Sequence, residues 1–299
     1  MSSPLVSVLM AAYNSENFIS EAIESVLASS YKNLELIICD DKSSDNTVSI
    51  ANTYKLKDNR VRVYINEKNL GDYPNRNRAA LYAKGTYIKY LDHDDIIYPW
   101  GLEAMLNCME KYPNAGFGLM SYGLVQTSSY PILNTPIQAY RNYFFKAALI
   151  GMGPSGAIFK KTAFDDVGGF SGKPFVGDSE IWLVLSQKYD LVRMPNDLIW
   201  YRIHADQESK REILDPMKAI RRFKILESAL EHPKCPLPEY EKRSALRNYK
   251  NVSVRQIILR NIFSLRFRQI IFHFKNCGFT FFDFLFAFTK NKKLLFLVN

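Results

Sequence analysis

The sequence has little cysteine and no long hydrophobic run. Its four cysteines are scattered along 299 residues and form no C-x-x-C pair: Cys39, Cys108, Cys235 and Cys277. This spacing excludes a disulfide framework and a cysteine zinc site, and it predicts reduced thiols in a cytoplasmic protein. No apolar stretch reaches the length of a membrane-spanning helix without a charge. Residues 5–12 are too short for the apolar core of a signal peptide, and no basic residue precedes them.

Internal repeats and low-complexity tracts are also absent, and the segment Ala11-Ala12-Tyr13-Asn14 lacks the glycines of a phosphate-cradling loop. The composition, with 47% hydrophobic and 23% charged residues, is ordinary for a globular protein. The length allows one large domain with an appendage, or two domains. The chain is therefore expected to fold around a sizeable core.

Excess positive charge is missing from the first 210 residues and concentrated in the rest. Residues 1–210 hold 21 lysines and arginines against 23 acidic residues, whereas residues 211–299 hold 18 against 7. The net charges are −2 and +11. Such a basic C-terminal part indicates an anionic surface as partner, either nucleic acid or acidic lipid.

Apolar β-rich runs alternate with helical patterns through the first half of the chain. Strands are predicted at residues 6–10, 34–39, 61–65, 87–91, 117–122, 157–159 and 198–203. Helices are predicted at residues 19–27, 48–54, 76–83, 102–111 and 180–185, and residues 126–140 show no periodicity and are expected to form a loop over the site. This alternation predicts an α/β fold with a parallel sheet, whose ligands bind beyond the carboxyl ends of the strands.

Acidic residues cluster at two of these strand ends. Asp92, Asp94 and Asp95 follow the strand at 87–91, and Asp40-Asp41 follow the strand at 34–39. Three carboxylates within four residues repel one another, and a divalent cation resolves the conflict because Mg²⁺ binds carboxylates together with substrate phosphates. Taken alone, such a stretch is more often a solvated acidic turn, and the sequence on either side is what favours a metal site. The hypothesis is a metal–diphosphate site.

Several motifs occur in one order between residues 4 and 210. They are residues 6–14, Asp40-Asp41-Lys42-Ser43-Ser44-Asp45, Asn69-Leu70-Gly71 with Arg76-Asn77, Leu91-Asp92-His93-Asp94-Asp95, Gly168-Gly169-Phe170, Gly177-Asp178-Ser179-Glu180 and Tyr201-Arg202-Ile203-His204. The set resembles the family-2 glycosyltransferases, inverting nucleotide-sugar transferases with the GT-A fold. An ordered set is far more specific than any single motif.

The resemblance implies a Rossmann-like GT-A domain at residues 1–210, with a mainly parallel sheet flanked by helices, followed by a helical extension at 211–299. It also implies roles for individual residues. Ala11, Tyr13 and Asp40 would hold the nucleotide base and ribose, Arg76 would approach the diphosphate, and Asp92 would contact the ribose or sugar. Asp94 and Asp95 would bind Mg²⁺ or Mn²⁺, and His204 would help hold the metal or diphosphate. Asp178 would be the catalytic base.

Each of these residues also has a structural interpretation when taken singly. Asp178 could be a helix N-cap, Asp40 a turn residue, and Arg76 a solvated helix residue. The chain also departs from the family pattern, because Gly177 stands where an acidic residue usually precedes the base. The departure leaves the base in place and bears on the choice of sugar.

The C-terminal part is rich in phenylalanine. Ten of the 20 phenylalanines lie between Phe263 and Phe288, and Lys290, Lys292 and Lys293 follow. Phenylalanine-rich helices beside basic residues favour a peripheral contact of residues 252–293 with the cytosolic face of an anionic membrane, and disfavour nucleic acid. The other interpretation is a helical subdomain packed on the catalytic domain or on another subunit, so an oligomer is possible.

The leading functional hypothesis is an inverting glycosyltransferase that moves a sugar from a nucleotide-sugar donor, a UDP-sugar, to a hydroxyl of a glycan or lipid-linked acceptor in cell-surface polysaccharide synthesis. A second hypothesis is nucleotidyl transfer to a sugar phosphate, which also uses paired aspartates and Mg²⁺. A third is a non-catalytic protein that binds nucleotide sugars.

Overall fold

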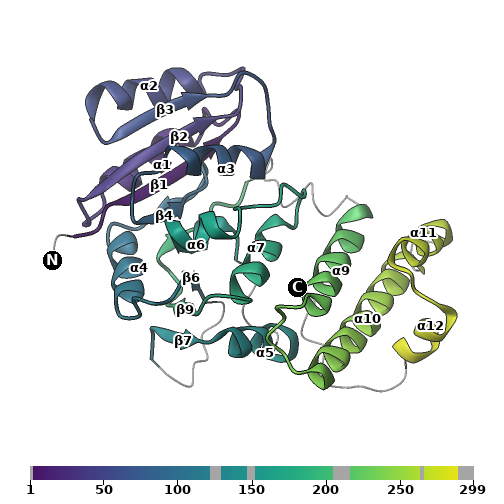
Figure 1. Ribbon diagram of the computed structural model, residues 1–299. Coiled ribbons are helices and arrows are strands. Elements are labelled where there is room, and N and C mark those ends of the chain that lie inside the picture. Colours follow the sequence, from purple (N-terminus) through teal and green to yellow (C-terminus); the bar gives the residue numbers. More distant parts are fainter. Residues whose placement is uncertain (1–2, 122–128, 147–151, 205–215, 263–265, 289–299) are drawn as a thin grey trace. The chain divides into compact units, whose positions relative to one another are not determined.

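The structure, a computed structural model, describes residues 3–121, 129–146, 152–204, 216–262 and 266–288 (Figure 1). The chain forms two compact units. The first comprises Met1–Ala139 with Ala148–His204, and the second comprises Tyr140–Ala147 with Ala205–Asn299. The predicted domain boundary at residue 210 lies outside the described residues.

The first unit is built on a sheet that has eight strands among the described residues, in the order β3-β2-β1-β4-β8-β6-β9-β7. The strands are β1 (Val6–Ala12), β2 (Leu34–Asp40), β3 (Val61–Ile65), β4 (Tyr87–Tyr90), β6 (Phe117–Met120), β7 (Ile132–Asn134), β8 (Ala157–Lys160) and β9 (Leu191–Met194). Strands β3, β2, β1 and β4 run parallel, as does the pair β6–β9, whereas β8 runs antiparallel to both of its neighbours. The sheet is mainly parallel, as predicted.

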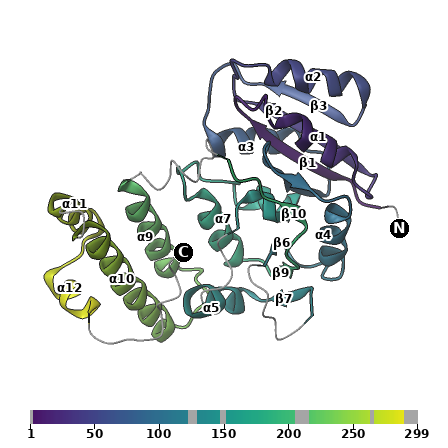
Figure 2. The ribbon, with the colours of Figure 1, turned by 180° about the vertical axis from the view of Figure 1, so that it is seen from behind.

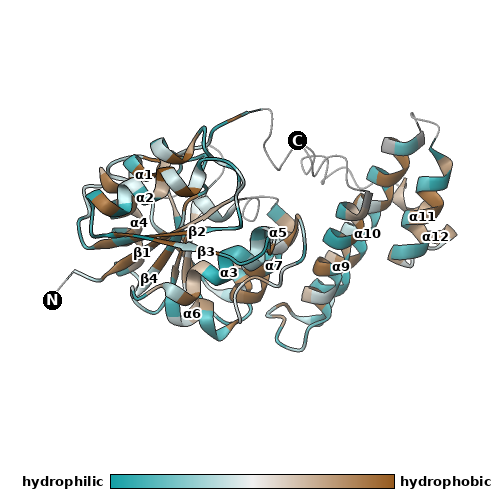
Figure 3. Ribbon diagram, turned by 90° about the horizontal axis from the view of Figure 1, so that it is seen from above, coloured by the Kyte–Doolittle hydropathy of each residue, from teal (hydrophilic) through white to brown (hydrophobic). Residues whose placement is uncertain are grey.

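Helices cover both faces of this sheet (Figure 3). On one face lie α1 (Ile19–Leu27), α2 (Thr47–Lys57) and α4 (Gly101–Glu110), and on the other lie α3 (Asp72–Tyr82), α6 (Lys161–Asp166) and α7 (Gly177–Ser186). Every residue of β1 and β2 is consequently buried. Parallel strands that are covered on both faces read as continuous apolar runs, and this is why the sequence predicts them so directly.

Helix α3 begins four residues earlier than the predicted start at Arg76. Gly71 precedes it with φ 89°, a conformation that favours glycine, and Asp72 and Pro74 occupy its first turn. An acidic residue and a proline are both compatible with the first turn of a helix, where main-chain N–H groups have no helical partner. The predicted helix was too short because its start was taken from the spacing of apolar residues and not from these start signals.

The segment 126–140 was predicted as a loop, and this is wrong for its second half. Residues 122–128 lie outside the described residues. Strand β7 pairs antiparallel with β9, and helix α5 (Pro136–Lys146) follows it. A three-residue strand has too few residues to show a period, so sequence patterning could not find it.

The strand predicted at 198–203 is also shorter than expected. Only β10 (Ile199–Trp200) forms (Figure 2). It pairs antiparallel with β5 (Ile96–Ile97) in a separate two-stranded sheet. The 3₁₀ helix η1 (Pro154–Gly156) leads into β8. The pairing of β10 with β5 brings the chain before His204 next to the segment that follows Asp95.

The second unit is helical in its described part. It contains the end of α5 from Tyr140, α9 (Pro216–Glu231), α10 (Glu239–Ile262), α11 (Phe267–Cys277) and α12 (Phe281–Ala287). Its core is formed by apolar residues of all four later helices, among them Phe223, Val254, Cys277 and Ala287. None of the described helices combines the length and the apolar character needed to cross a membrane.

Candidate active site

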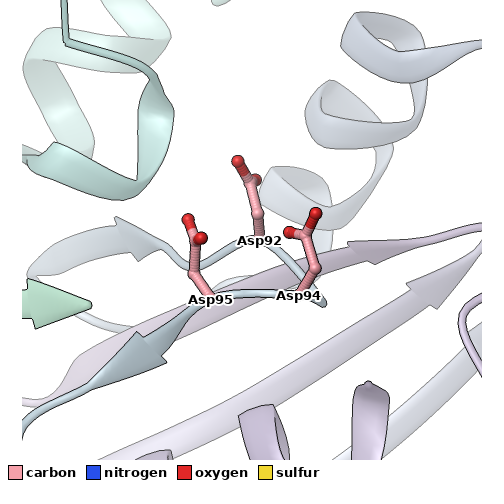
Figure 4. Close-up of side chains that lie close together, drawn as sticks. All are labelled: Asp92, Asp94 and Asp95. Atoms are coloured by element: carbon pink, nitrogen blue, oxygen red, sulfur yellow. The ribbon is translucent and has the colours of Figure 1, made fainter. Parts of the chain in front are cut away.

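The three aspartates Asp92, Asp94 and Asp95 lie in the turn that joins β4 to β5. One carboxylate oxygen from each lies within 4.8 Å of the others, and the three side chains point to the same side of the turn (Figure 4). Asp95 is buried, whereas Asp92 and Asp94 are half-buried. The fold therefore concentrates three carboxylates, which repel one another, beyond the carboxyl end of a central strand.

Two of the three carboxylates have a basic partner. The Nη1 atom of Arg76 lies 2.6 Å from Oδ1 of Asp92, and Nε2 of His204 lies 2.8 Å from Oδ2 of Asp94. Burial raises the pKa of Asp92, but the charge and hydrogen bond of Arg76 outweigh burial and hold that pKa below its usual value. Asp92 is therefore ionised at neutral pH.

Asp95 has a different environment. Its carboxylate accepts a hydrogen bond from the main-chain N–H of Arg202 at 3.2 Å. Burial, together with the charges of Asp92 and Asp94, raises the pKa of Asp95 to about 7. The raised pKa means that the surrounding protein does not fully neutralise the cluster, so an added positive charge would stabilise it.

This donor set fits a hard divalent cation. Mg²⁺ and Mn²⁺ prefer oxygen ligands, and carboxylates that project from one turn supply them at close range. Asp94 and Asp95 were predicted as ligands, and both belong to the group of three together with Asp92. His204 lies outside that group and contacts it through Asp94.

The segment 200–204 holds the acidic turn in place mainly through Arg202. Its Nε donates to the carbonyl oxygen of Asp94 at 3.0 Å, and Nη2 lies 2.6 Å from the carboxylate of Glu21. Its guanidinium lies over two aromatic rings, 5.0 Å from the centre of Phe18 and 4.8 Å from that of Trp200. Arg202 belongs to the motif at residues 201–204, but no role was predicted for it, because stacking and main-chain contacts leave no mark on residue spacing.

Lys89 is a second charged residue that the sequence analysis missed. It lies on β4 and is completely buried, and its ammonium donates to the carbonyl oxygens of Tyr90 and Ser155. Burial lowers its pKa to about 7, although the charges of Asp92 and Asp95 act in the opposite direction. A lysine inside an otherwise apolar strand was the available signal, since lysine is almost never fully buried without partners.

Helix α3 connects the acidic turn to the rest of the site. Arg76 is 8% exposed, and its Nε lies 2.7 Å from Asp72 Oδ1 while Nη1 contacts Asp92. Burial lowers the pKa of Arg76, but Asp72 and Asp92 raise it well above the usual value, so the guanidinium is always charged. The residue predicted to approach a diphosphate is thus fixed beside the carboxylate cluster and is not a solvated helix residue.

The same helix contacts the segment that carries Asp178. Asp178 lies in the first turn of α7, and its main-chain N–H donates to the hydroxyl of Tyr73 on α3 at 3.2 Å. Its carboxylate accepts a hydrogen bond from the N–H of Ser179 at 2.6 Å. The positive end of the helix favours an ionised carboxylate at this position. Tyr73 follows Asp72, so one turn of α3 connects Asp178 to Arg76 and hence to Asp92.

The residues predicted to hold the nucleotide lie at the ends of β1 and β2. In the register of these strands Ala11 is opposite Cys39 and Ala12 is opposite Asp40. Asp40 is buried, and its carboxylate accepts hydrogen bonds from the main-chain N–H of Ser43, at 2.9 Å, and from its hydroxyl. The ring of Tyr13 is 48% exposed. Asp40 therefore closes its own turn, and Tyr13 offers an open aromatic face.

Asp41 has a role that the sequence analysis did not assign. Its Oδ1 accepts from the N–H of Leu70 and from the side-chain amide of Asn66, both at 2.8 Å. Its Oδ2 accepts from the N–H of Gly71, also at 2.8 Å. The carboxylate thus fixes the residues immediately before α3, and α3 in turn carries Tyr73 and Arg76.

The model of the family "Glycosyl transferase family 2" matches residues 7–168, a little over half of the chain. This range contains the nucleotide-side residues, Arg76 and the acidic turn. The match ends before Asp178 and His204, which lie in the part of the first unit that follows.

Curated proteins show the same relationship. The chain is 30% identical over 228 residues to the Escherichia coli protein named UDP-Glc:alpha-D-GlcNAc-diphosphoundecaprenol beta-1,3-glucosyltransferase WfaP, covering 75% of this chain and 86% of WfaP. It is 40% identical over 125 residues to E. coli WfgD, whose name gives the same reaction, covering 42% of this chain and 48% of WfgD. WfgD and two further relatives, at 44% and 45%, are matched over about half of their own length.

Two of the solved structures that match the chain show the same fold. S. aureus TarS 1–349 in complex with UDP-GlcNAc matches with a TM-score of 0.70 at 19% identity, over 95% of this chain and 81% of that one. The mannosyltransferase PcManGT from Pyrobaculum calidifontis, in complex with GDP-Man and Mn²⁺, matches with a TM-score of 0.65 at 16% identity, over 93% and 76%. These likenesses confirm the predicted GT-A fold.

The family model and the relative matched over most of its length agree with the ordered motifs and with the observed sheet. The predicted family is therefore confirmed. The chain belongs to glycosyl transferase family 2, a family of enzymes that transfer sugars.

Proposed function

We propose that this protein is an inverting glycosyltransferase that moves a sugar from a UDP-sugar to a hydroxyl group of a lipid-linked acceptor. The observation that carries the proposal is the group of three carboxylates within 4.8 Å of one another, joined through Arg76 to the helix that also contacts Asp178. A nucleotide-sugar transferase needs these two functions in one unit: a charged site for a leaving diphosphate and a carboxylate base.

The nucleotide is proposed to bind at the ends of β1 and β2. The exposed ring of Tyr13 supplies a face on which a base can stack, and Ala11 leaves room for close approach because its side chain is small. Asp40 shapes this loop through Ser43, and its carboxylate is proposed to accept from a base or ribose. These features support Ala11, Tyr13 and Asp40 as the nucleotide-binding residues.

The leaving diphosphate is proposed to lie against the acidic turn. A Mg²⁺ or Mn²⁺ ion bound by Asp94 and Asp95 would neutralise the charge that develops on the phosphates. Asp92 is proposed to orient the ribose or sugar, and the buried guanidinium of Arg76 gives the surroundings of that carboxylate a fixed positive charge. His204 keeps Asp94 in position through their 2.8 Å contact.

Asp178 is proposed to be the general base. Its position in the first turn of α7 favours the ionised form, which is the form that accepts a proton. As the acceptor hydroxyl attacks the anomeric carbon, its proton passes to Asp178 and the bond to the diphosphate breaks. One displacement of this kind inverts the anomeric configuration.

The nature of the acceptor is inferred from relatives. WfaP and WfgD are both named for a transfer from UDP-Glc to alpha-D-GlcNAc-diphosphoundecaprenol. We infer an acceptor of the same class, a sugar carried on a polyprenyl diphosphate, in the synthesis of a cell-surface polysaccharide. The donor is proposed as a class, the UDP-sugars.

The test is donor turnover by the full chain with a panel of UDP-sugars and a lipid-linked GlcNAc acceptor. Transfer should require Mg²⁺ or Mn²⁺ and should fall by at least about 10³-fold in Asp178→Asn and in Asp94→Asn. Asp165→Asn, a change to an exposed acidic residue on α6, is the matched control and should leave the rate unchanged. Unchanged rates in both active-site variants would refute the proposal, and release of pyrophosphate from a nucleoside triphosphate would indicate nucleotidyl transfer.

A lipid-linked acceptor is consistent with a membrane contact, which we propose for α11 and α12 of the second unit. These helices and the residue that follows them expose large apolar side chains: Phe267, Ile271, Phe272, Phe281, Phe282, Phe284, Leu285, Phe286 and Phe288. Arg266, Arg268 and Lys275 are exposed on or beside α11. Exposed aromatics beside cations suit the interface of an anionic bilayer. Of the rest of the predicted range 252–293, residues 252–262 belong to α10, and residues 263–265 and 289–293 lie outside the described residues.

The membrane contact can be tested by co-sedimentation with vesicles. The full chain should bind vesicles that contain phosphatidylglycerol and bind less to pure phosphatidylcholine. Replacing Phe282 and Leu285 by serine should weaken binding at least about tenfold, because each substitution removes apolar surface from the interface. Leu56→Ser, which changes a side chain that is 88% exposed on α2, is the control. Equal binding of the double variant and the control would refute the contact.

A further inference from the structure

Gly177, the residue before the proposed base, is required by its surroundings. A Cβ atom on Gly177 would lie 2.8 Å from Cε2, 2.9 Å from Cδ2 and 3.0 Å from Cγ of Tyr73. Real Cβ atoms do not approach other atoms so closely, so a side chain at position 177 would overlap the tyrosine ring. The ring of Tyr73 thus fills the space beside Asp178 where an acidic side chain is usual in the family.

The ring cannot easily move aside. Tyr73 is 7% exposed, and its ring centre lies 5.1 Å from that of Phe170. Phe170 is fixed to α3 at both main-chain polar groups: its N–H donates to Asn77 Oδ1 at 2.9 Å, and its carbonyl oxygen accepts from Asn77 Nδ2 at 2.7 Å. The tyrosine is therefore enclosed between its own helix, the segment at Phe170 and the start of α7.

The hydroxyl of Tyr73 contacts the main chain of Asp178. It accepts the N–H of Asp178 at 3.2 Å, while the Asp178 carboxylate accepts from the next residue, Ser179. Burial and the negative charges of Asp178 and Asp72 raise the pKa of Tyr73, so the hydroxyl stays protonated at neutral pH. The contact therefore persists over the pH range in which a glycosyltransferase works.

We propose that Tyr73 is a positioning residue for the catalytic base, and that Gly177 is its necessary counterpart. The ring sets the separation of α7 from α3, and the hydroxyl fixes the main chain from which the Asp178 carboxylate projects. Because Arg76 lies three residues further along α3, the base is held relative to Asp92 and the acidic turn. This inference rests on the proposed function, in which Asp178 takes the proton of the acceptor.

The role predicts a specific kinetic signature. A small displacement of the base leaves donor binding intact, because Tyr73 is not among the residues proposed to hold the nucleotide. It weakens proton transfer in the transition state, and so lowers kcat without a matching rise in the KM of the donor. A purely structural role would lower stability and leave kcat per folded molecule unchanged.

The first experiment compares the full-length wild type with Tyr73→Phe, which keeps the ring and removes the hydroxyl. The expected result is a fall in kcat of about 10- to 100-fold, as for a misplaced catalytic group. The affinity for UDP with Mn²⁺, measured by calorimetry, should stay within about twofold, since a twofold change is well under 1 kcal/mol. The pH–rate profile should also shift on its acidic limb. Unchanged kcat and profile in Tyr73→Phe would overturn the positioning role.

The second experiment tests the pair. Gly177→Ala should lower both kcat and the unfolding midpoint, because the added methyl group overlaps the ring. In a Tyr73→Ser background the same glycine substitution should have little further effect, since the overlap is gone. Effects that multiply in the double variant would show that the two positions act independently and would refute the coupling.

The two proposals fail in different ways. If the wild type binds UDP and Mn²⁺ but transfers no sugar from any donor in the panel, the proposed function is wrong, and the inference about Tyr73 is wrong with it. If the wild type is active and Asp178→Asn is not, but Tyr73→Phe matches the wild type, only the positioning role is wrong.

Discussion

Arg76 and Asp92 form an ion pair, with 2.6 Å between Nη1 and Oδ1, that connects helix α3 to the turn after β4. The guanidinium is buried and contacts a second carboxylate, that of Asp72, at 2.7 Å. The pair therefore joins the segment that carries the carboxylate cluster to the helix that contacts Asp178.

Arg76→Gln should destabilise the protein by about 3 kcal/mol, because it leaves two half-buried carboxylates without their buried counter-ion. Arg76→Lys should be milder but still harmful, since an ammonium cannot reproduce two contacts from one planar group. The measurement is urea denaturation at pH 7. Arg78→Gln, which changes an exposed arginine on the same helix, should stay within about 0.5 kcal/mol of the wild type. Equal stabilities of the Arg76 and Arg78 variants would contradict the structural role.

Metal affinity should rise with pH up to about 7 and then level off, because the pKa of Asp95 is raised to about 7. Below that pH the folded protein holds a proton on Asp95, and the metal must displace it, so the affinity gains up to about tenfold for each pH unit. Calorimetric titration with Mn²⁺ between pH 5.5 and 8 measures this slope. Asp95→Asn should bind more weakly and with a flatter pH dependence. A slope that persists in Asp95→Asn would assign the proton to another group.

Arg202→Lys should weaken Mn²⁺ binding about 10- to 100-fold without removing a metal ligand, since groups that hold the ligands contribute on this scale. The lysine cannot both contact the Asp94 carbonyl and lie over Phe18 and Trp200. Glu21→Gln is the matched control, because it removes only the exposed partner of Arg202, and exposed ion pairs contribute little. Wild-type metal affinity in Arg202→Lys would show that the acidic turn holds its shape unaided.

Asp41→Asn should cost about 1–2 kcal/mol, because the amide has only one oxygen and loses its hydrogen bond to the part-buried N–H of Leu70 or of Gly71 before α3. Thermal or urea unfolding measures the loss. Asp40→Asn is the comparison, since the Asp40 carboxylate accepts from the N–H and hydroxyl of Ser43, and its proposed role is in nucleotide binding. Asp41→Asn should therefore change stability more than UDP affinity, and Asp40→Asn should do the reverse. If Asp40→Asn lowered stability more and Asp41→Asn lowered UDP affinity more, the roles assigned to the two residues would be wrong.

The sequence predicts the parallel half of the sheet well for a simple reason. Strands β1, β2 and β4 are buried on both faces, so each is a mainly apolar run, interrupted only by Ser7, Glu35 or Lys89. The acidic residues after β2 and β4 can be recognised in the sequence because they directly follow these apolar runs. Strand β7 and the full length of α3 were missed, because a three-residue strand has no period and α3 begins with polar residues.

The sequence itself determined the residue types of the site: three aspartates in one turn, an aspartate at the start of α7, and an arginine on α3. Which of them meet was decided only by the tertiary structure. Tyr73 lies 105 positions before the N–H that it accepts, and Arg202 lies 108 after the carbonyl that it contacts. Such contacts depend on how helices and loops pack against a sheet. Packing brings together residues that are far apart in the chain and that no spacing relates. For that reason the sequence predicted the acidic cluster, Arg76 and Asp178, but not the roles of Tyr73 and Arg202, which depend on tertiary contacts.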